Sequence, residues 1–102
     1  MAKLLVLYHT PSNAAAFDTH YNRTHVGLAK KLPGLRSYTI SKGPIASPGG
    51  TSPYHLIADL TFDSTGAIQA ALVSPEGQAA VADLANFASA GVTISMYEMR
   101  DA

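Results

Sequence analysis

Four histidines and five tyrosines are the residues best suited to chemistry in this chain, of which only 14% is charged. Tyr21 and His25 stand four residues apart in a segment with helical periodicity, so they share one face of the predicted helix. A neutral imidazole beside a phenol suits proton transfer, or a hydrogen bond to a carbonyl or phenol, near pH 7. His25 also stands beside the apolar stripe of that helix, where a buried imidazole needs a partner. His25 is therefore the leading candidate for a functional residue.

The other candidate site residues lie on predicted strands. Tyr38 falls within the second strand, and His55 opens the third. Each candidate also has a structural interpretation, in which Tyr21 belongs to the core and His55 makes a hydrogen bond at a sheet edge. His9 and His20 are expected to be solvated surface residues.

Several other kinds of site are not predicted. His20 and His25 are five residues apart rather than four, and no His-Glu-x-x-His pattern occurs, so a helical zinc site is not expected. The chain has no cysteine, which excludes thiolate nucleophiles and cysteine metal sites. No Gly-x-Ser-x-Gly elbow, dinucleotide fingerprint or phosphate-binding glycine loop is present. We expect no metal and no tightly held dinucleotide.

The apolar pattern predicts strands and helices in the order β-α-β-β-α-β within a single domain, residues 1–102. Strands are expected at 3–9, 35–41, 54–62 and 92–99, helices at 14–32, 66–73 and 75–91, and a loop rich in proline and glycine at 43–53. Right-handed crossovers then give an α+β fold, in which a four-stranded antiparallel sheet carries the helices on one face.

The helices should bury one stripe each against that sheet. In the first helix the predicted stripe consists of Phe17, Tyr21, Thr24, Leu28 and Leu32. In the last helix it consists of Val81, Leu84 and Ala88, with Phe87 alongside.

The first strand is apolar on both alternating sets of side chains: Leu4, Val6 and Tyr8 on one side, Leu5 and Leu7 on the other. Such a strand is typically covered on both faces. The helices cover one face only, so the other face is expected to pack against the same face of a second copy. The low charged fraction, against about 25% in a typical domain, agrees with this. We expect a homodimer with two facing sheets.

The charge pattern argues against two classes of partner. Seven Lys and Arg balance seven Asp and Glu, so no electrostatic footprint for nucleic acid or an anionic membrane is present. No segment approaches the roughly 20 apolar residues that span a bilayer, and the run at residues 4–8 is too short for a signal peptide. A small domain without disulfides fits the reducing cytoplasm.

Several stretches of the sequence resemble the EthD family, and the resemblance runs through essentially the whole chain. The most specific are Phe17-Asp18-x-x-Tyr21-x-x-Thr24-His25-Val26-x-Leu28-Ala29 and Leu32-Pro33-Gly34-Leu35-Arg36. Phe62-Asp63-Ser64, Ser74-Pro75-Glu76-Gly77-Gln78 and Asn86-Phe87 are also similar. The chain departs from the pattern at Gly27, where many relatives have proline.

The resemblance implies a dimeric α+β barrel of ferredoxin-like subunits, each with an apolar and aromatic pocket between helices and sheet. Family members accompany the degradation of ethers and other small organic compounds. In several members of the wider superfamily a histidine matching His25 lies at the pocket. His25 would then be an acid/base or hydrogen-bonding group for a small hydrophobic, aromatic or lactone-like compound. Tyr21 and Tyr38 would assist it, and His55 would reach the same cavity.

Three functional classes stay open on the sequence alone. The first is a catabolic enzyme or accessory protein that transfers protons as an isomerase or cyclase does. The second is an oxidoreductase that is cofactor-free or linked to haem; since the chain offers no redox group, a cofactor-free oxygenase would use the substrate's own electrons. The third is a binding module for a hydrophobic metabolite without turnover. No cofactor is expected in the first class, and haem is the one alternative.

Overall fold

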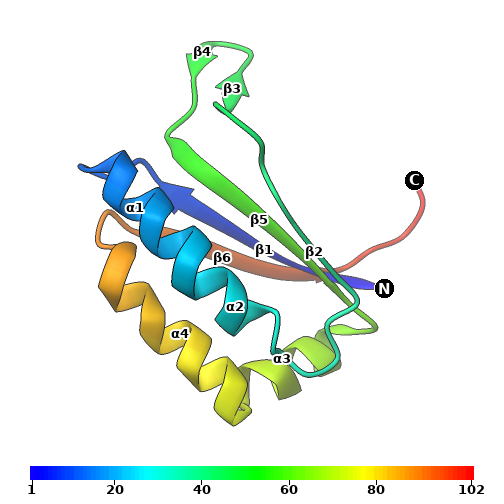
Figure 1. Ribbon diagram of the computed structural model, residues 1–102. Helices are drawn as coiled ribbons and strands as arrows, with labels where there is room; N and C mark the ends of the chain where they lie inside the picture. The colour runs from blue at the N-terminus through cyan, green and yellow to red at the C-terminus, as the bar shows by residue number, and fades with distance from the viewer.

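The computed structural model describes residues 1–102 as one antiparallel sheet with helices packed on one of its faces (Figure 1). The four long strands lie in the order β2-β5-β1-β6. Their bounds are β1 Ala2–His9, β2 Ser37–Ile40, β5 Tyr54–Phe62 and β6 Val92–Glu98. The helices are α1 Ala14–His20, α2 Val26–Ala29, α3 Thr65–Val73 and α4 Pro75–Phe87, with a π-helical turn, η1, at Tyr21–His25. The predicted α+β, ferredoxin-like fold is confirmed.

Side-chain oxygens cap three of the helices where the sequence predicts their starts. Asn13 accepts from the backbone N–H of Ala16 at the start of α1, and Ser64 accepts from that of Ala67 in α3. Ser74 caps α4 just before its first-turn proline. None of the helices combines the length and apolar character needed to cross a membrane.

The segment 43–53 contains a short hairpin that composition alone does not predict. Its strands, β3 Ala46–Ser47 and β4 Gly50–Thr51, pair only with each other. The hairpin projects beyond one end of the main sheet (Figure 1). The hairpin lies in the connection between β2 and β5, which are the two strands farthest from β6 in the order of the sheet.

The register of the strands sorts their side chains into two faces. Val6 of β1 lies opposite Ala58 of β5 and Ile94 of β6, and all three face the helices. Tyr38 joins them from β2, opposite Leu60. The core lies between this face and the helices, and its most deeply buried large side chains are Tyr8, Tyr21, Phe62 and Ile68.

The first helix buries a different stripe from the one predicted. Thr24 is exposed and Leu28 is only half-buried, whereas His25 and Ala29 are buried. The cause is the π-helical turn, in which the backbone N–H of Val26 bonds the carbonyl of Tyr21, five residues earlier. Because this turn holds more residues than an α-helical turn, side chains at successive spacings of four stay on one face. The turn thereby directs His25 into the core.

The stripe of α4 is also shifted from the predicted one. Val81 is 49% exposed, whereas Ala80, Asp83 and Phe87 are buried. Gly77 allows α4 to approach α3 closely, since a Cβ there would lie 2.1 Å from the carbonyl oxygen of Ala71. The rotated stripe places one carboxylate, Asp83, inside the molecule.

Candidate functional site

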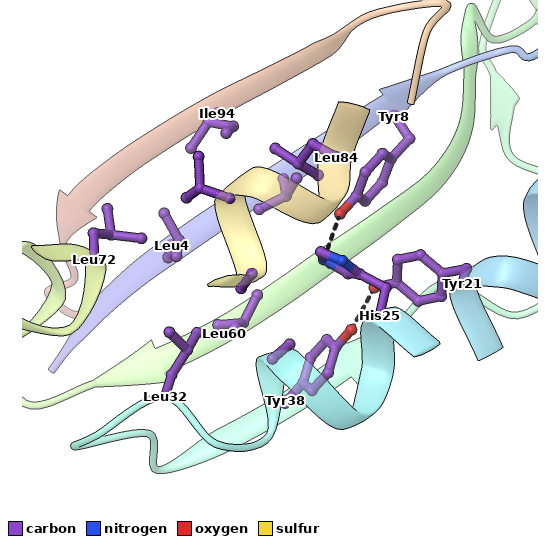
Figure 2. Close-up of a pocket in the computed structure, with 15 residues that line it drawn as sticks. Leu4, Tyr8, Tyr21, His25, Leu32, Tyr38, Leu60, Leu72, Leu84 and Ile94 are labelled. Atoms are coloured by element: carbon purple, nitrogen blue, oxygen red, sulfur yellow. Dashed lines mark hydrogen bonds between the residues drawn. The ribbon is translucent and has the colours of Figure 1, made fainter. Parts of the chain in front are cut away.

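A cavity of about 100 Å³ lies between the helices and the sheet (Figure 2). Fourteen of its fifteen lining residues are hydrophobic or tyrosine, and the other is His25. His25 and Tyr8 lie toward one end, whereas Leu4, Leu72 and Ile94 lie toward the other (Figure 2). The apolar end is open to solvent, because Ile94 is 45% exposed. The cavity thus has an apolar mouth and a polar end.

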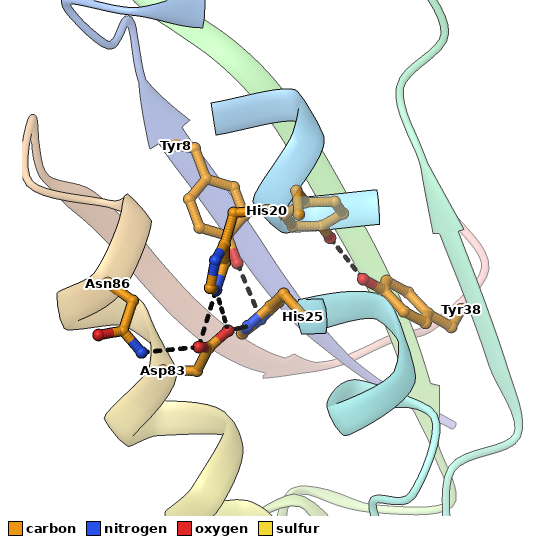
Figure 3. A network of polar contacts seen from close by, with 7 residues as sticks. Tyr8, His20, His25, Tyr38, Asp83 and Asn86 are labelled. Carbon is orange, nitrogen blue, oxygen red and sulfur yellow. Dashed lines mark hydrogen bonds and ion pairs between the residues drawn. The ribbon is translucent and has the colours of Figure 1, made fainter. Parts of the chain in front are cut away.

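His25 is held at the polar end by hydrogen bonds to both ring nitrogens (Figure 3). Nδ1 lies 3.0 Å from Oδ2 of Asp83 on α4, and Nε2 lies 3.3 Å from the hydroxyl of Tyr8 on β1. An ionised carboxylate only accepts hydrogen bonds, so Nδ1 carries the hydrogen. Nε2 is then the acceptor in the neutral ring. The basic lone pair of His25 is therefore on Nε2, the nitrogen to which the Tyr8 hydroxyl donates.

Asp83 is a buried carboxylate with three nitrogen donors. Besides His25, Nε2 of His20 lies 2.8 Å from Oδ1, and Nδ2 of Asn86 donates to the same oxygen at 3.0 Å. Burial alone would raise the pKa of Asp83, but the hydrogen bonds from Asn86, His20 and His25 outweigh it and lower the pKa below its ordinary value. Asp83 is consequently an anion at neutral pH, fixed in orientation by its neighbours.

Burial lowers the pKa of His25 below its ordinary value of 6.5, while Asp83 opposes that shift. The ring is therefore neutral at pH 7. Its orientation by a carboxylate on Nδ1 is the arrangement that prepares a histidine to accept a proton at Nε2. In chemical terms, the site offers a base at the end of an apolar cavity.

Tyr21 and Tyr38 form a second polar group on the cavity wall, where their hydroxyls are hydrogen-bonded to each other (Figure 2). Burial raises the pKa of both phenols, and it raises that of Tyr8 as well. All three tyrosines are thus neutral hydrogen-bond donors at physiological pH. The structure brings Tyr21, Tyr38 and His25 to one cavity.

His55 does not line this cavity, contrary to the expectation. Its Nε2 lies 2.8 Å from Oδ1 of Asp18, and its ring packs edge-on against Phe17. The pairing of β1 with β5 is irregular at this point, because His9 pairs with Tyr54 while Tyr8 pairs with Leu56. The extra residue turns His55 toward α1, away from the face that strict alternation predicts.

The two remaining histidines have different environments. His9 is half-buried at the end of β1, where it bonds Thr93 and packs on Tyr54 outside the cavity. His20 was expected to be a solvated surface residue, but it bonds Asp83 and stacks on Phe87.

Sequence reasoning missed Asp83 and Tyr8 as members of the site. A signal for Asp83 existed: it stands three residues after Ala80 and four before Phe87, so it is an acidic residue at a core-facing spacing. Tyr8 was assigned only to the apolar face of its strand, and nothing in its spacing distinguishes it. No group of three or more histidine or acidic side chains is placed to hold a metal ion.

The model of the family described as EthD domain matches residues 9–91 of the chain. The chain belongs to the EthD family. The match contains His25 and Asp83, so both lie in the segment that defines an EthD protein.

Two relatives support the assignment. An uncharacterized 11.0 kDa protein in the thcB-thcC intergenic region of Rhodococcus erythropolis is 40% identical over 92% of this chain and 90% of its own length. The crystal structure of an ethyl tert-butyl ether D (EthD) family protein from Bacillus halodurans has a TM-score of 0.89 and 35% identity, covering 98% of this chain and 99% of that one.

More distant structures share the fold of this EthD protein. SnoaB, a cofactor-independent oxygenase from Streptomyces nogalater, has a TM-score of 0.68 at 15% identity, over 99% of this chain and 94% of that one. Other neighbours of similar score are described as dimeric ferredoxin-like proteins. At such identities the likeness concerns the fold alone.

Proposed function

We propose that this EthD protein binds a small uncharged organic molecule in the cavity between helices and sheet, and that His25 exchanges a proton with it. The observation that carries the proposal is the position of His25. Its neutral ring is oriented by Asp83 through Nδ1, with Nε2 at the end of an otherwise apolar cavity. A buried, oriented imidazole beside a concave apolar surface is a characteristic combination for acid–base chemistry on a small ligand.

The proton step follows from the two polar groups of the cavity. An acidic O–H or C–H of the ligand takes the place of the Tyr8 hydroxyl at Nε2 of His25 and transfers its proton there. The bond's electron pair stays on the ligand as an enolate- or phenolate-like anion. The displaced Tyr8 hydroxyl, or the Tyr21–Tyr38 pair, donates a hydrogen bond to that anion. Return of the proton to another ligand atom completes an isomerisation without an oxidant.

The lining of the cavity restricts the ligand. No lysine or arginine lines it, so a carboxylate or phosphate would have no charged partner there. An apolar cavity of ~150 Å³ is known to bind benzene. This cavity measures about 100 Å³ and is open at one end, so it suits a molecule of about one ring, such as a phenol or a small lactone.

We propose no resident cofactor for this reaction. Histidines that bind a metal commonly donate their other ring N–H to a carboxylate, as His25 does to Asp83. Judged by this pair only, His25 could bind a haem iron. The enclosed part of the cavity measures only about 100 Å³, which favours a one-ring ligand over a porphyrin, since pockets for drug-sized ligands begin at about 300 Å³.

The proposal is tested with 4-methylphenol and toluene, which differ by one hydroxyl. Wild type is expected to bind 4-methylphenol at least tenfold more tightly than toluene, and His25→Gln is expected to lose that preference, because the hydroxyl loses its acceptor (a factor of ten is ~1.4 kcal/mol). Binding is followed by NMR titration. His55→Gln is the matched control, since His55 pairs with a carboxylate outside the cavity.

Turnover is tested separately by hydrogen–deuterium exchange at the carbon next to the carbonyl of γ-butyrolactone. Wild type should accelerate this exchange in D₂O, and His25→Gln should not. Binding of 4-methylphenol without any exchange would favour the binding-module alternative, and oxygen uptake with a phenolic ligand would favour the cofactor-free oxygenase. An unchanged phenol preference in His25→Gln would remove His25 from the site.

We also propose that the protein is a homodimer joined through the face of the sheet that the helices leave uncovered. Leu5 and Leu7 of β1 and Ile57 of β5 lie on this face and are only half-buried in the single chain. Polar groups on the same face are partly paired, as Lys3 bonds Thr61 and lies 3.3 Å from Asp59. Structural neighbours described as dimeric ferredoxin-like proteins support the proposal.

A further inference from the structure

Asp83 is shared by two histidines that differ in their access to solvent. His25 Nδ1 lies 3.0 Å from Oδ2, and His20 Nε2 lies 2.8 Å from Oδ1 and 3.1 Å from Oδ2 (Figure 3). The side chains of Asp83 and His25 are 6% and 8% exposed, whereas that of His20 is 28% exposed. One buried carboxylate thus stands between an imidazole that water reaches and one that it hardly reaches.

A positive charge beside the buried carboxylate of Asp83 is favourable, and among its nitrogen partners only a histidine can carry one. They are His20, His25 and the neutral amide of Asn86. An imidazolium is better solvated at His20, where water reaches the ring. The two histidine nitrogens contact the same carboxylate oxygen and are therefore within about 6 Å of each other, so a charge on one disfavours a charge on the other.

We propose that His20 carries the proton that balances Asp83, which leaves His25 neutral with a free lone pair, and that His20 gives this proton to solvent when His25 accepts one from a ligand. The second half rests on the proposed function. His25 keeps its Nδ1 hydrogen and gains one on Nε2, while His20 keeps the Nε2 hydrogen that bonds Asp83 and loses one from Nδ1. The three residues carry no net charge before or after the step. His20 is a positioning residue in this scheme.

The other groups that face the two histidines are compatible with this exchange. The neutral phenol of Tyr8 contacts His25, and those of Tyr21 and Tyr38 lie on the same cavity wall. Arg23, which is exposed, lines a surface hollow together with His20. Phe87 carries no charge; it stacks on the His20 ring and also contacts the His25 ring.

The test replaces His20 with glutamine and follows the imidazole ¹⁵N signals of His25 by NMR across pH. In His20→Gln the amide still donates to Asp83 but cannot carry a proton. His25 must then supply the positive charge, and we expect it to bind a proton at least tenfold more tightly than in wild type. His55→Gln is the matched control, because it removes a histidine paired with a carboxylate elsewhere. That variant should leave the titration of His25 unchanged.

Wild type alone gives a second measurement that needs no variant. As the pH is lowered, the signals of His20 should report the first proton bound and those of His25 the second. An unchanged His25 titration in His20→Gln, as a purely structural role for His20 would give, overturns the proposal. Protonation of His25 before His20 in wild type overturns it as well. These titrations use no ligand, so their outcome is independent of the binding test with 4-methylphenol and toluene. Either the charge on His20 or the proposed function can therefore be refuted without the other.

Discussion

At the residue scale, the property that matters most is the neutral charge of His25. Burial lowers its pKa, so the folded protein resists protonation of a ring that the unfolded chain protonates near pH 6.5. The stabilisation that His25 contributes is therefore fully present above pH 6.5 and is lost as the pH falls through the lowered pKa of the folded state. Asp83 acts in the same direction at more acidic pH, because its pKa is lowered from 3.8.

Comparison of wild type with His25→Gln isolates this contribution. We expect the difference in their free energies of unfolding to shrink as the pH is lowered from 7.5 to 5, since only wild type has the buried ring to protonate. Urea unfolding at the two pH values measures it. A difference that grows on acidification would mean that His25 is charged in the folded protein.

At the scale of elements, the π-helical turn and the close contact of α3 with α4 together place His25 against Asp83. The turn keeps His25 on the buried face of the first helix, and Gly77 lets α4 approach α3 closely at its first turn. These two features set the relative position of the histidine and the carboxylate, which come from different helices.

Two glycines in these helices should respond to alanine in opposite ways. A Cβ at Gly27 meets no atom within 4 Å, so Gly27→Ala should stabilise the protein by about 0.5–1 kcal/mol through helix propensity. A Cβ at Gly77 would lie 2.1 Å from the Ala71 carbonyl oxygen and 2.6 Å from that of Leu72, so Gly77→Ala should destabilise it by more than about 1 kcal/mol. Urea unfolding measures both. Equal changes in the free energy of unfolding for Gly27→Ala and Gly77→Ala would show that α3 and α4 move apart at no cost to accommodate the new Cβ.

The sequence predicts the elements well, and the site only in part. The apolar pattern locates the strands and the helix starts, because it is a local property of the chain. The π-helical turn changes which side chains share a face, so the prediction from α-helical spacing wrongly placed Thr24 and Leu28 in the buried stripe. Asp83 lies 58 residues from His25, and no local pattern reports a pairing at that distance. The direction of His55 could not be predicted, because the irregular strand pairing breaks the alternation.

At the scale of the whole molecule, the sheet is covered on one face only. Edge strand β6 is exposed along almost its whole length, and Leu5, Leu7 and Ile57 form the apolar centre of the other face. Burial of these side chains against a second copy would remove apolar area from water at ~25 cal/mol per Å². The cavity lies on the opposite face, so the proposed dimer leaves its walls within one chain.

Leu7→Glu should convert the dimer to a monomer, because it places a charge at the centre of the proposed interface. Size-exclusion chromatography with light scattering measures the mass. Val73→Glu is the control, since Val73 is 72% exposed on a helix away from that face. A wild-type mass near 10.7 kDa would show that the chain is monomeric and would refute the interface.

The ¹⁵N signals of the His25 ring during titration with 4-methylphenol at pH 7.5 test the central claim most directly. In the free protein Nδ1 should be the protonated nitrogen, because it donates to Asp83, and Nε2 should be unprotonated. On binding, the ligand hydroxyl should replace the long 3.3 Å bond from Tyr8 with a shorter one, so the Nε2 signal should move further toward that of a protonated nitrogen while Nδ1 stays protonated. Binding that leaves the Nε2 signal unchanged, or an Nε2 already protonated without ligand, would contradict a base at the end of this cavity.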